Sequence, residues 1–245
     1  FTLPASHPGT SVELMLEFKG IEFRRVDLLP AVHRGLLKLA GFSGNTVPAL
    51  RFNGEKFQHS VEIARGLDRL VPKPPLLPPE GDPRRDAVLE AENLGEATLQ
   101  HLVRQIIWWL LRRDRSTLVT YMERAKLPAP KQVAAKTAGP LVIASARLNE
   151  STDGNVRARL AELPAILDRL DGWVEDGTIG GETPNAADFQ IAPSILLAMT
   201  MEDLRPFIAA RPIGAAARRI DPDFPGTLQP GLPAEWLAPL RAAAS

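Results

Sequence analysis

A proline-rich stretch, Val71 to Pro83, divides this chain of 245 residues into two parts of different character. It reads VPKPPLLPPEGDP, and its repeated prolines fix φ and lack amide donors, so it predicts a semi-rigid extended connector. Before it the expected elements are short and mixed, and after it long helical patterns dominate. We therefore expect one unit at residues 1–72, a linker at 73–81 and a second unit at 82–245.

The first unit has the pattern of a small sheet with helices. Strands are expected at 1–3 and 22–28, and helices at about 12–20, around 36–39 and at 60–70. Asn53-Gly54 separates two further strand patterns and is a strong signal for a two-residue hairpin. The expected order is βαβαββα, with a sheet that is parallel at first and closed by an antiparallel hairpin.

The second unit reads as helical. Asp82-Pro83 is a helix start, and the apolar positions from Val88 to Leu111 predict one helix of about thirty residues. Further helices are expected at 118–126, 156–174 and 185–201, the last with Asn185 and Asp188 at capping spacing. The proline-rich C-terminal segment is expected to pack against the surface of the protein, with one short helical piece near Trp236.

Composition excludes several classes of function. The 29 basic and 29 acidic residues give no net charge, so neither nucleic acid nor an anionic membrane is an expected partner. No segment approaches the roughly 18 apolar residues that a membrane span needs. The chain has no cysteine and opens at Phe1 without a basic, apolar leader, which favours a cytoplasmic protein. His33 and His101 lack a second ligand at metal spacing, so no metal is expected.

Three short motifs resemble those of cytosolic glutathione S-transferases. Asn45–Leu50 resembles the family's segment with a cis proline. His59–Ile63 resembles the motif that opens the third helix, and Asn185–Phe189 resembles the buried capping motif of the helical domain. Their order and spacing extend the resemblance over essentially the whole chain. It implies an α/β plus all-α architecture, in which a thioredoxin-like βαβαββα domain is followed by an all-helical domain.

The resemblance also implies glutathione as co-substrate and a set of binding residues. The backbone of Val47, before Pro48, would pair with the cysteinyl unit, and Ser60 with its helix end would hold the γ-glutamyl carboxylate. The ordinary alternatives are a proline that begins a strand and a serine that caps a helix. His59 replaces the acidic residue or glutamine that engages the ligand's amino group. This change leaves open another small thiol, or a non-catalytic binding or assembly protein.

Ser6 is the candidate catalytic residue. Ser6-His7-Pro8 resembles the theta-class pattern in the turn entering the first helix, with Pro8 where cysteine-using classes keep their cysteine. Glutathione must be held as thiolate although a free thiol has a pKa of about 8.5, and a hydroxyl donor together with a helix N-terminus would favour the anion. Thr10 with Glu13 is expected to form a capping box.

Several other positions carry weaker expectations. Ser11 is expected to be solvated, and a serine hydrolase is disfavoured because no acid accompanies His7. Glu62 and Gly66 stand where the family commonly has alanine and an aromatic residue.

The acceptor is expected to be a small electrophilic or peroxidic molecule held by the helical domain. Trp108 and Tyr121 are weak candidates for lining its pocket. Because adjacent helical residues diverge by about 100°, at most one of Trp108 and Trp109 can face the pocket. A zeta-like isomerase, which would need a basic anion-binding pocket, is a further alternative. The resemblance alone implies a homodimer.

Overall fold

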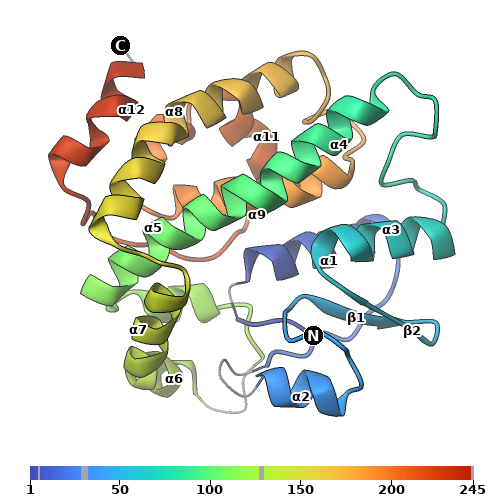
Figure 1. The fold of residues 1–245 in the computed structure, drawn as a ribbon, viewed down its shortest axis with the longest axis horizontal. Helices are drawn as coiled ribbons and strands as arrows, with labels where there is room; N and C mark the ends of the chain where they lie inside the picture. Colours follow the sequence, from blue (N-terminus) through green and yellow to red (C-terminus); the bar gives the residue numbers. More distant parts are fainter. Residues whose placement is uncertain (5, 29–32, 127–129, 244–245) are drawn as a thin grey trace.

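The computed structural model describes residues 1–4, 6–28, 33–126 and 130–243, and it has the expected mixed N-terminal part and helical C-terminal part. In Figure 1 the strands lie between helix α2 (His33–Leu39) on one side and helices α1 (His7–Phe18) and α3 (Ser60–Leu70) on the other. Helices α1 and α3 in turn face the helical part. This arrangement agrees with a thioredoxin-like domain joined to an all-helical domain.

The hairpin is confirmed. Strands β1 (Ala49–Phe52) and β2 (Glu55–Gln58) are antiparallel, with Ala49 opposite Gln58. Asn53 and Gly54 have φ of 49° and 84°, the conformation that a tight two-residue hairpin requires.

The two earlier strands, expected at 1–3 and 22–28, are reduced to one parallel bridge between Thr2 and Asp27. Phe1 joins this bridge to the hairpin, since it exchanges backbone hydrogen bonds with Ala49 at 2.9 and 3.0 Å. Residues 22–24 are all exposed, so they have no buried face that would hold them in a longer ladder.

The long helix is confirmed but starts later than expected and is not uniform. It consists of α4 (Arg85–Asn93), the π-helical segment η1 (Leu94–Leu99) and α5 (Gln100–Arg113). Asp82 shapes the preceding turn instead of capping, because its carboxylate accepts from the Arg84 amide at 2.9 Å. A Cβ on Gly95 would lie 3.0 Å from Ile191, so the π-helical segment lies where another helix passes closely.

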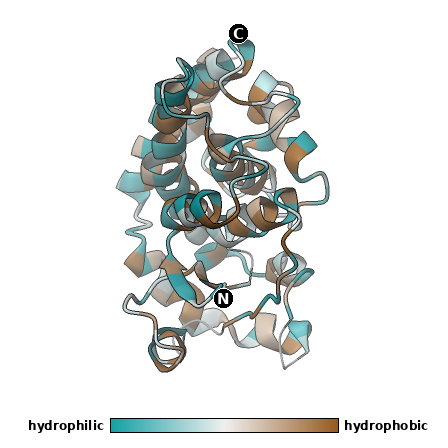
Figure 2. Cartoon of the chain, turned by 90° about the vertical axis from the view of Figure 1, so that its right-hand side faces the viewer, coloured by the Kyte–Doolittle hydropathy of each residue, from teal (hydrophilic) through white to brown (hydrophobic). Residues whose placement is uncertain are grey.

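That crossing helix is α9 (Ala186–Met199), which is buried along its entire length. Asn185 and Asp188 form the predicted reciprocal capping box. Helix α9 contacts α1, α4, α5 and α11 (Pro212–Ile220), and α8 (Asp153–Glu175) packs against α5 and α11. One continuous hydrophobic core therefore joins both parts of the chain. Most helices in Figure 2 accordingly carry both hydrophilic and hydrophobic residues around their turns.

Other elements differ from expectation. The helix expected at 118–126 is the short 3-10 helix η2 (Leu118–Met122). The sequence pattern did not predict α6 (Lys131–Thr137), α7 (Gly139–Leu148), α10 (Arg205–Ile208) or α11, of which α6, α7 and α10 are short or only weakly amphipathic. The predicted helical piece near Trp236 is present as η3 (Ala234–Leu237), followed by α12 (Ala238–Ala243).

The proline-rich connector forms hydrogen bonds to α3 and to the start of α9. Leu76 and Leu77 are buried, and their amides donate to the Asp68 carboxylate at 2.8 and 3.1 Å. The Leu76 carbonyl accepts from the Ala186 amide at 2.7 Å, at the start of α9. The connector thus links α3 to the central helix. Within the described ranges, no helix is both long and apolar enough to cross a membrane.

Candidate functional site

Ser6 lies at the entry to helix α1, as its N-cap. Its backbone is extended, and its Oγ accepts a hydrogen bond from the Gly9 amide at 3.1 Å. Gly9 allows the helix end to lie against the N-terminal segment, because a Cβ there would be 2.0 Å from Thr2 Oγ1. Since the Ser6 hydroxyl accepts from the backbone, its own proton remains available for donation.

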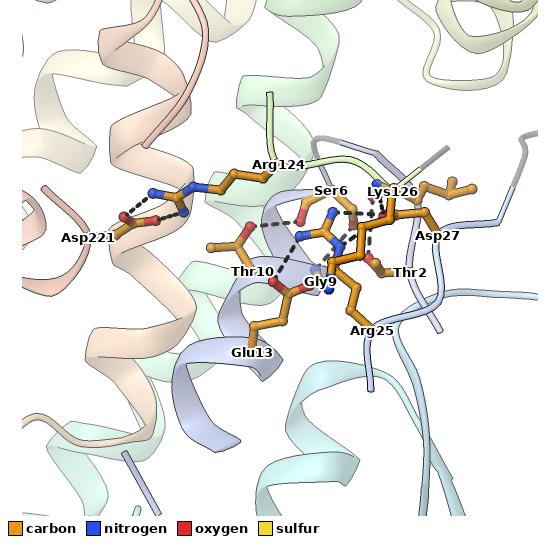
Figure 3. A network of polar contacts seen from close by, with 11 residues as sticks. Thr2, Ser6, Gly9, Thr10, Glu13, Arg25, Asp27, Arg124, Lys126 and Asp221 are labelled. Atoms are coloured by element: carbon orange, nitrogen blue, oxygen red, sulfur yellow. Dashed lines mark hydrogen bonds and ion pairs between the residues drawn. The ribbon is translucent and has the colours of Figure 1, made fainter. Parts of the chain in front are cut away.

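The predicted capping box of Thr10 and Glu13 is wrong. Thr10 lies inside the helix and donates to the Ser6 carbonyl at 3.3 Å. Glu13 instead pairs with Arg25 at 2.9 Å, and Arg25 also pairs with Asp27 (Figure 3). Ser11, expected to be solvated, is 1% exposed and donates to the His7 carbonyl. The helix begins earlier than predicted because Ser6, not Thr10, satisfies its first amides.

The network around Arg25 continues into the helical domain. Asp27 accepts from the Lys126 amide at 2.7 Å, which fixes the segment after η2 beside the N-terminal strand. Arg124 in the same segment forms a bidentate pair with Asp221 at 2.6 and 2.7 Å (Figure 3). Burial raises the pKa of the Glu13 carboxyl, while Arg25 opposes this shift. The neighbourhood of Ser6 is thus tied to both parts of the chain.

Val47 presents a free backbone edge beside the hairpin. The Val47–Pro48 peptide bond is cis, and Val47 itself is half-buried. In the described part of the chain, neither its amide nor its carbonyl has a hydrogen-bond partner. The Pro48 carbonyl accepts from the His59 amide at 3.2 Å, which places the start of α3 next to this edge. An extended ligand could therefore pair with Val47 as an additional strand would.

The start of α3 offers the features of an anion site. His59, the N-cap, has φ 65° and ψ 140°, a backbone conformation that costs a non-glycine residue about 1–3 kcal/mol and is often found at functional sites. It makes no side-chain cap, and the first intrahelical bond runs from the Ile63 amide. The amides of Ser60, Val61 and Glu62 precede that bond, so they lack intrahelical partners. The exposed His59 ring lies 3.4 Å from Thr46 Oγ1.

Helix α9 holds the starts of α1 and α3 together. Gln190 Nε2 donates to Ser60 Oγ at 2.8 Å, and Ser194 Oγ lies 2.9 Å from His7 Nδ1. Gln190 and Ser194 are four residues apart, so these two anchor points are about 6 Å apart along the helix axis. Ser6, beside His7, and Ser60 are thereby brought to one region of the molecule.

Sequence reasoning missed Gln190 and Ser194. The signal was available, because beyond the capping residue Asp188 they are the two polar residues of an apolar helix, AADFQIAPSILLAM, and lie on one face of it. Their side chains are 1% exposed, and each reaches into the N-terminal domain. Polar residues at such positions need partners from another element, and here those partners are the two helix starts.

The two acceptor-pocket candidates have different surroundings. Trp108 is half-buried and packs against the core from α5. Tyr121 is 3% exposed and its hydroxyl bonds to Thr200 Oγ1 at 2.8 Å. Burial raises the pKa of Tyr121 to about 12. Trp109 lies in the core and donates to Asp153 at 2.8 Å, so the adjacent tryptophans do point in different directions.

One cavity adjoins this region but is too small for a substrate. It has a volume of about 50 Å³ and lies between α1 and the sheet, where Val12, Leu16 and Pro48 are among its lining residues. Small-molecule pockets usually measure roughly 300–1,000 Å³. Within the described ranges, no group of three or more His, Cys, Asp or Glu side chains is placed to hold a metal ion.

Comparison with known proteins finds one matching family model and several solved structures of similar fold. Residues 1–75 match the family described as "Glutathione S-transferase, N-terminal domain". No curated protein sequence matches the chain. The fold resembles a GST-like protein from Pseudomonas syringae, with 18% identity and a TM-score of 0.56, covering 94% of this chain and 68% of that one.

Two further solved structures are similar. A glutathione S-transferase of Ceriporiopsis subvermispora, solved in complex with glutathione, has 16% identity and a TM-score of 0.53, covering 96% of this chain and 98% of that one. FzlA from C. crescentus has 16% identity and a TM-score of 0.50, with 97% and 96% covered. Residues 1–75 therefore match the N-terminal domain of glutathione S-transferases, and the chain as a whole has the fold of these solved structures.

Proposed function

We propose that this protein, with its glutathione S-transferase N-terminal domain, binds glutathione and transfers it as thiolate to a small electrophilic or peroxidic substrate. The observation that carries the proposal is the unpaired backbone of Val47 next to the open start of α3. A peptide backbone and a carboxylate are the groups that these two features bind. Glutathione contains both, since its cysteinyl unit is flanked by amide bonds and its γ-glutamyl unit carries a free α-carboxylate.

Ser6 is the proposed catalytic residue. Its hydroxyl accepts from Gly9 and would donate its proton to the sulfur of glutathione. The N-terminus of α1, a helix of 12 residues, adds a positive partial charge at the same place. Both effects favour the thiolate over the thiol and so lower the thiol pKa from about 8.5. With an electrophile, the thiolate attacks the electrophilic carbon and the leaving group departs with the electron pair of the broken bond. With a peroxide, the thiolate attacks one oxygen, the other leaves as an alkoxide that takes up a proton, and a second glutathione converts the sulfenic acid to the disulfide and water.

His59 would change how the amino group of glutathione is held. The ordinary acidic partner is absent at this position, and the His59 ring is exposed and lies near Thr46. A neutral imidazole can accept a hydrogen bond from an ammonium group but supplies no opposite charge. We therefore propose that glutathione binding depends more on Val47, Ser60 and the helix end than on an ion pair.

The binding part of the proposal is tested by calorimetric titration with glutathione. The Val47→Ala variant should bind like the wild type, because the recognised atoms belong to the backbone. The Ser60→Ala variant should bind about tenfold or more weakly, as expected for loss of a hydrogen bond to a charged group. Far-UV circular dichroism of both variants controls for folding. A wild-type protein that does not bind glutathione would refute the proposal.

Turnover of 1-chloro-2,4-dinitrobenzene distinguishes an enzyme from a binding module. Glutathione-dependent turnover that saturates with substrate supports the transferase. Binding without turnover of this or a peroxide substrate would favour the non-catalytic alternative that His59 suggests. Turnover of a cis-configured substrate to its trans isomer, without conjugation, would favour the zeta-like isomerase instead.

The wider organisation is also proposed. We propose domains at 1–72 and 82–245 joined by the linker 73–81, a homodimer in solution, and action in the cytoplasm. Sedimentation analysis checks the oligomeric state, and a fluorescent fusion in the source cell checks the compartment. A strictly monomeric protein would remove the homodimer from the proposal without affecting the glutathione site.

A further inference from the structure

The hydroxyl of Ser60 accepts a hydrogen bond but has no acceptor for its own proton. Ser60 is the first residue of α3 and is 2% exposed. Gln190 Nε2, on the central helix α9, donates to Ser60 Oγ at 2.8 Å, although the two residues are 130 positions apart. Because an amide N–H only donates, the serine oxygen is the acceptor in this contact. Within the described ranges Ser60 Oγ has no other partner, so its proton is free to be donated.

The side chain of Gln190 is held in place from the helical domain. It is 1% exposed, and a Cβ on Gly95 would lie 3.1 Å from its Cγ, so the π-helical segment η1 confines it. In the described chain its only hydrogen bond is the one to Ser60, and its Oε1 is buried without a partner. A buried amide with an unpartnered oxygen is less favourable than an apolar side chain of the same size. Stability of the fold therefore does not explain a glutamine at this position.

The groups around the free proton of Ser60 are also donors. The amides of Ser60, Val61 and Glu62 lack intrahelical partners at the start of α3. The Glu62 carboxylate is turned toward β2, where it accepts from the Gln58 amide at 3.3 Å. A group that lies against this helix start and satisfies both the amides and the hydroxyl must be an acceptor, and a carboxylate can accept several such bonds at once.

We propose that Gln190 is a positioning residue that makes the start of α3 selective for a carboxylate. By donating to Ser60 Oγ from the interior, Gln190 occupies a lone pair of that oxygen and fixes the rotation of the hydroxyl. The serine proton then points to the ligand. The inference rests on the proposed glutathione site and names the group selected there, the α-carboxylate of the γ-glutamyl unit.

The test compares glutathione with 4-aminobutyryl-cysteinylglycine, which lacks only that carboxylate. Both are titrated calorimetrically into the wild type, Gln190→Met and Gln105→Met. Gln105 is the matched control, because it is also 1% exposed but bonds to the Asn149 carbonyl and to Arg159 within the helical domain. The wild type and Gln105→Met should bind glutathione about tenfold or more tightly than the analogue. In Gln190→Met this preference should fall by about threefold to tenfold, with the affinity for the analogue unchanged.

A double-mutant cycle shows whether Gln190 acts through Ser60. In a Ser60→Ala background, Gln190→Met should cause no further loss of preference for glutathione, because the hydroxyl that it orients is gone. Gln190→Asn, with a side chain too short to reach Ser60, should behave like Gln190→Met in both backgrounds. Thermal unfolding should place Gln190→Met at the wild-type melting temperature or above it.

The outcomes separate this inference from the proposed function. An unchanged preference in Gln190→Met and Gln190→Asn would overturn the positioning role and leave the glutathione site intact. The same would follow if Gln190→Met weakened glutathione binding equally with and without the Ser60 hydroxyl, since Gln190 would then act only on the packing of the domains. A wild type that does not bind glutathione would overturn both.

Discussion

At the scale of single residues, Ser6 combines a structural and a proposed chemical role. Its Oγ caps α1 by accepting from Gly9, and the same oxygen carries the proton proposed to stabilise the thiolate. Loss of turnover in an alanine variant would therefore be ambiguous, because both roles disappear. The two are separable, since the cap needs only an acceptor whereas the thiolate needs a donor.

Three substitutions at Ser6 separate these roles. Ser6→Ala should lose about 1 kcal/mol of stability, the usual cost of losing a cap, together with most turnover. Ser6→Asp should keep the cap but lose turnover, because an ionised carboxylate cannot donate and repels the thiolate. Ser6→Thr should keep both. Urea unfolding measures the stability of each variant, and the pH dependence of thiolate absorbance near 240 nm measures how strongly it stabilises the bound thiolate. If Ser6→Asp retained wild-type turnover, Ser6 would have no part in the chemistry.

At this scale, the sequence predicted contacts between residues that are close along the chain but not contacts between distant segments. The position of Ser6 at a helix entry follows from local pattern. The partner of Glu13 does not, because Arg25 comes from another segment and outcompetes the local Thr10 contact. Likewise the contact of Gln190 with Ser60 is visible only when α9 lies against the start of α3.

At the scale of elements, the departure at Gly66 has a physical explanation. A Cβ at this position of α3 would lie 2.5 Å from the ring of Phe57 on β2, closer than real contacts allow. Phe57 is 7% exposed and belongs to the main core. The strand thus supplies an aromatic ring over the helix, and position 66 has room for no side chain.

Gly66→Ala should accordingly destabilise the protein, although alanine favours helices. Overpacking of this kind costs about 1–3 kcal/mol. Gly172 is the matched control, since it lies in α8 with open space at its Cβ, and Gly172→Ala should stabilise by about 0.5–1 kcal/mol. In a Phe57→Leu background the cost of Gly66→Ala should shrink. Equal costs in both backgrounds, by urea unfolding, would exclude the clash as the cause.

The elements with strong signals were the ones predicted correctly. The Asn53-Gly54 hairpin, the Asn185–Asp188 cap and helix α3 are each specified by residues within a few positions. Helix α6 was missed because it is short and has no buried residue. Helix α11 was missed although it has a buried face, because that face is formed mainly by small residues, Gly214, Ala216 and Ala217. The shortness of the first strands was also unpredictable, since their pairing depends on the Phe1–Ala49 contact, 48 positions apart.

At the scale of the whole molecule, the two domains share one core and one buried polar contact region. Helix α9 contacts His7 and Ser60 through Ser194 and Gln190, so the proposed glutathione site and the domain interface depend on the same residues. The linker signal and the motif order predicted both domains. They did not predict that His7 would be buried between them, in contact with Ser194.

Burial of His7 links global stability to pH. Burial, together with the nearby Arg104, lowers the pKa of His7 to about 3, from 6.5 for the unperturbed side chain. The unfolded chain therefore takes up a proton as pH falls through 6.5, whereas the folded protein does not until near 3. Protons favour unfolding over this window, so stability is complete above about pH 7 and is lost as pH falls. Between pH 8 and 5 the loss from this one residue is about 2 kcal/mol.

Replacing His7 should remove that loss. His7→Asn keeps a side chain able to reach Ser194 but cannot titrate, so its unfolding free energy should fall by about 2 kcal/mol less than that of the wild type between pH 8 and 5. The half-buried His101 provides the control, and His101→Asn should retain most of the acid dependence. Urea unfolding at several pH values measures the slopes. All groups other than His7 titrate alike in wild type and His7→Asn, so the difference between their slopes reports His7. Parallel slopes for these two proteins would show that the domain interface admits the protonated ring.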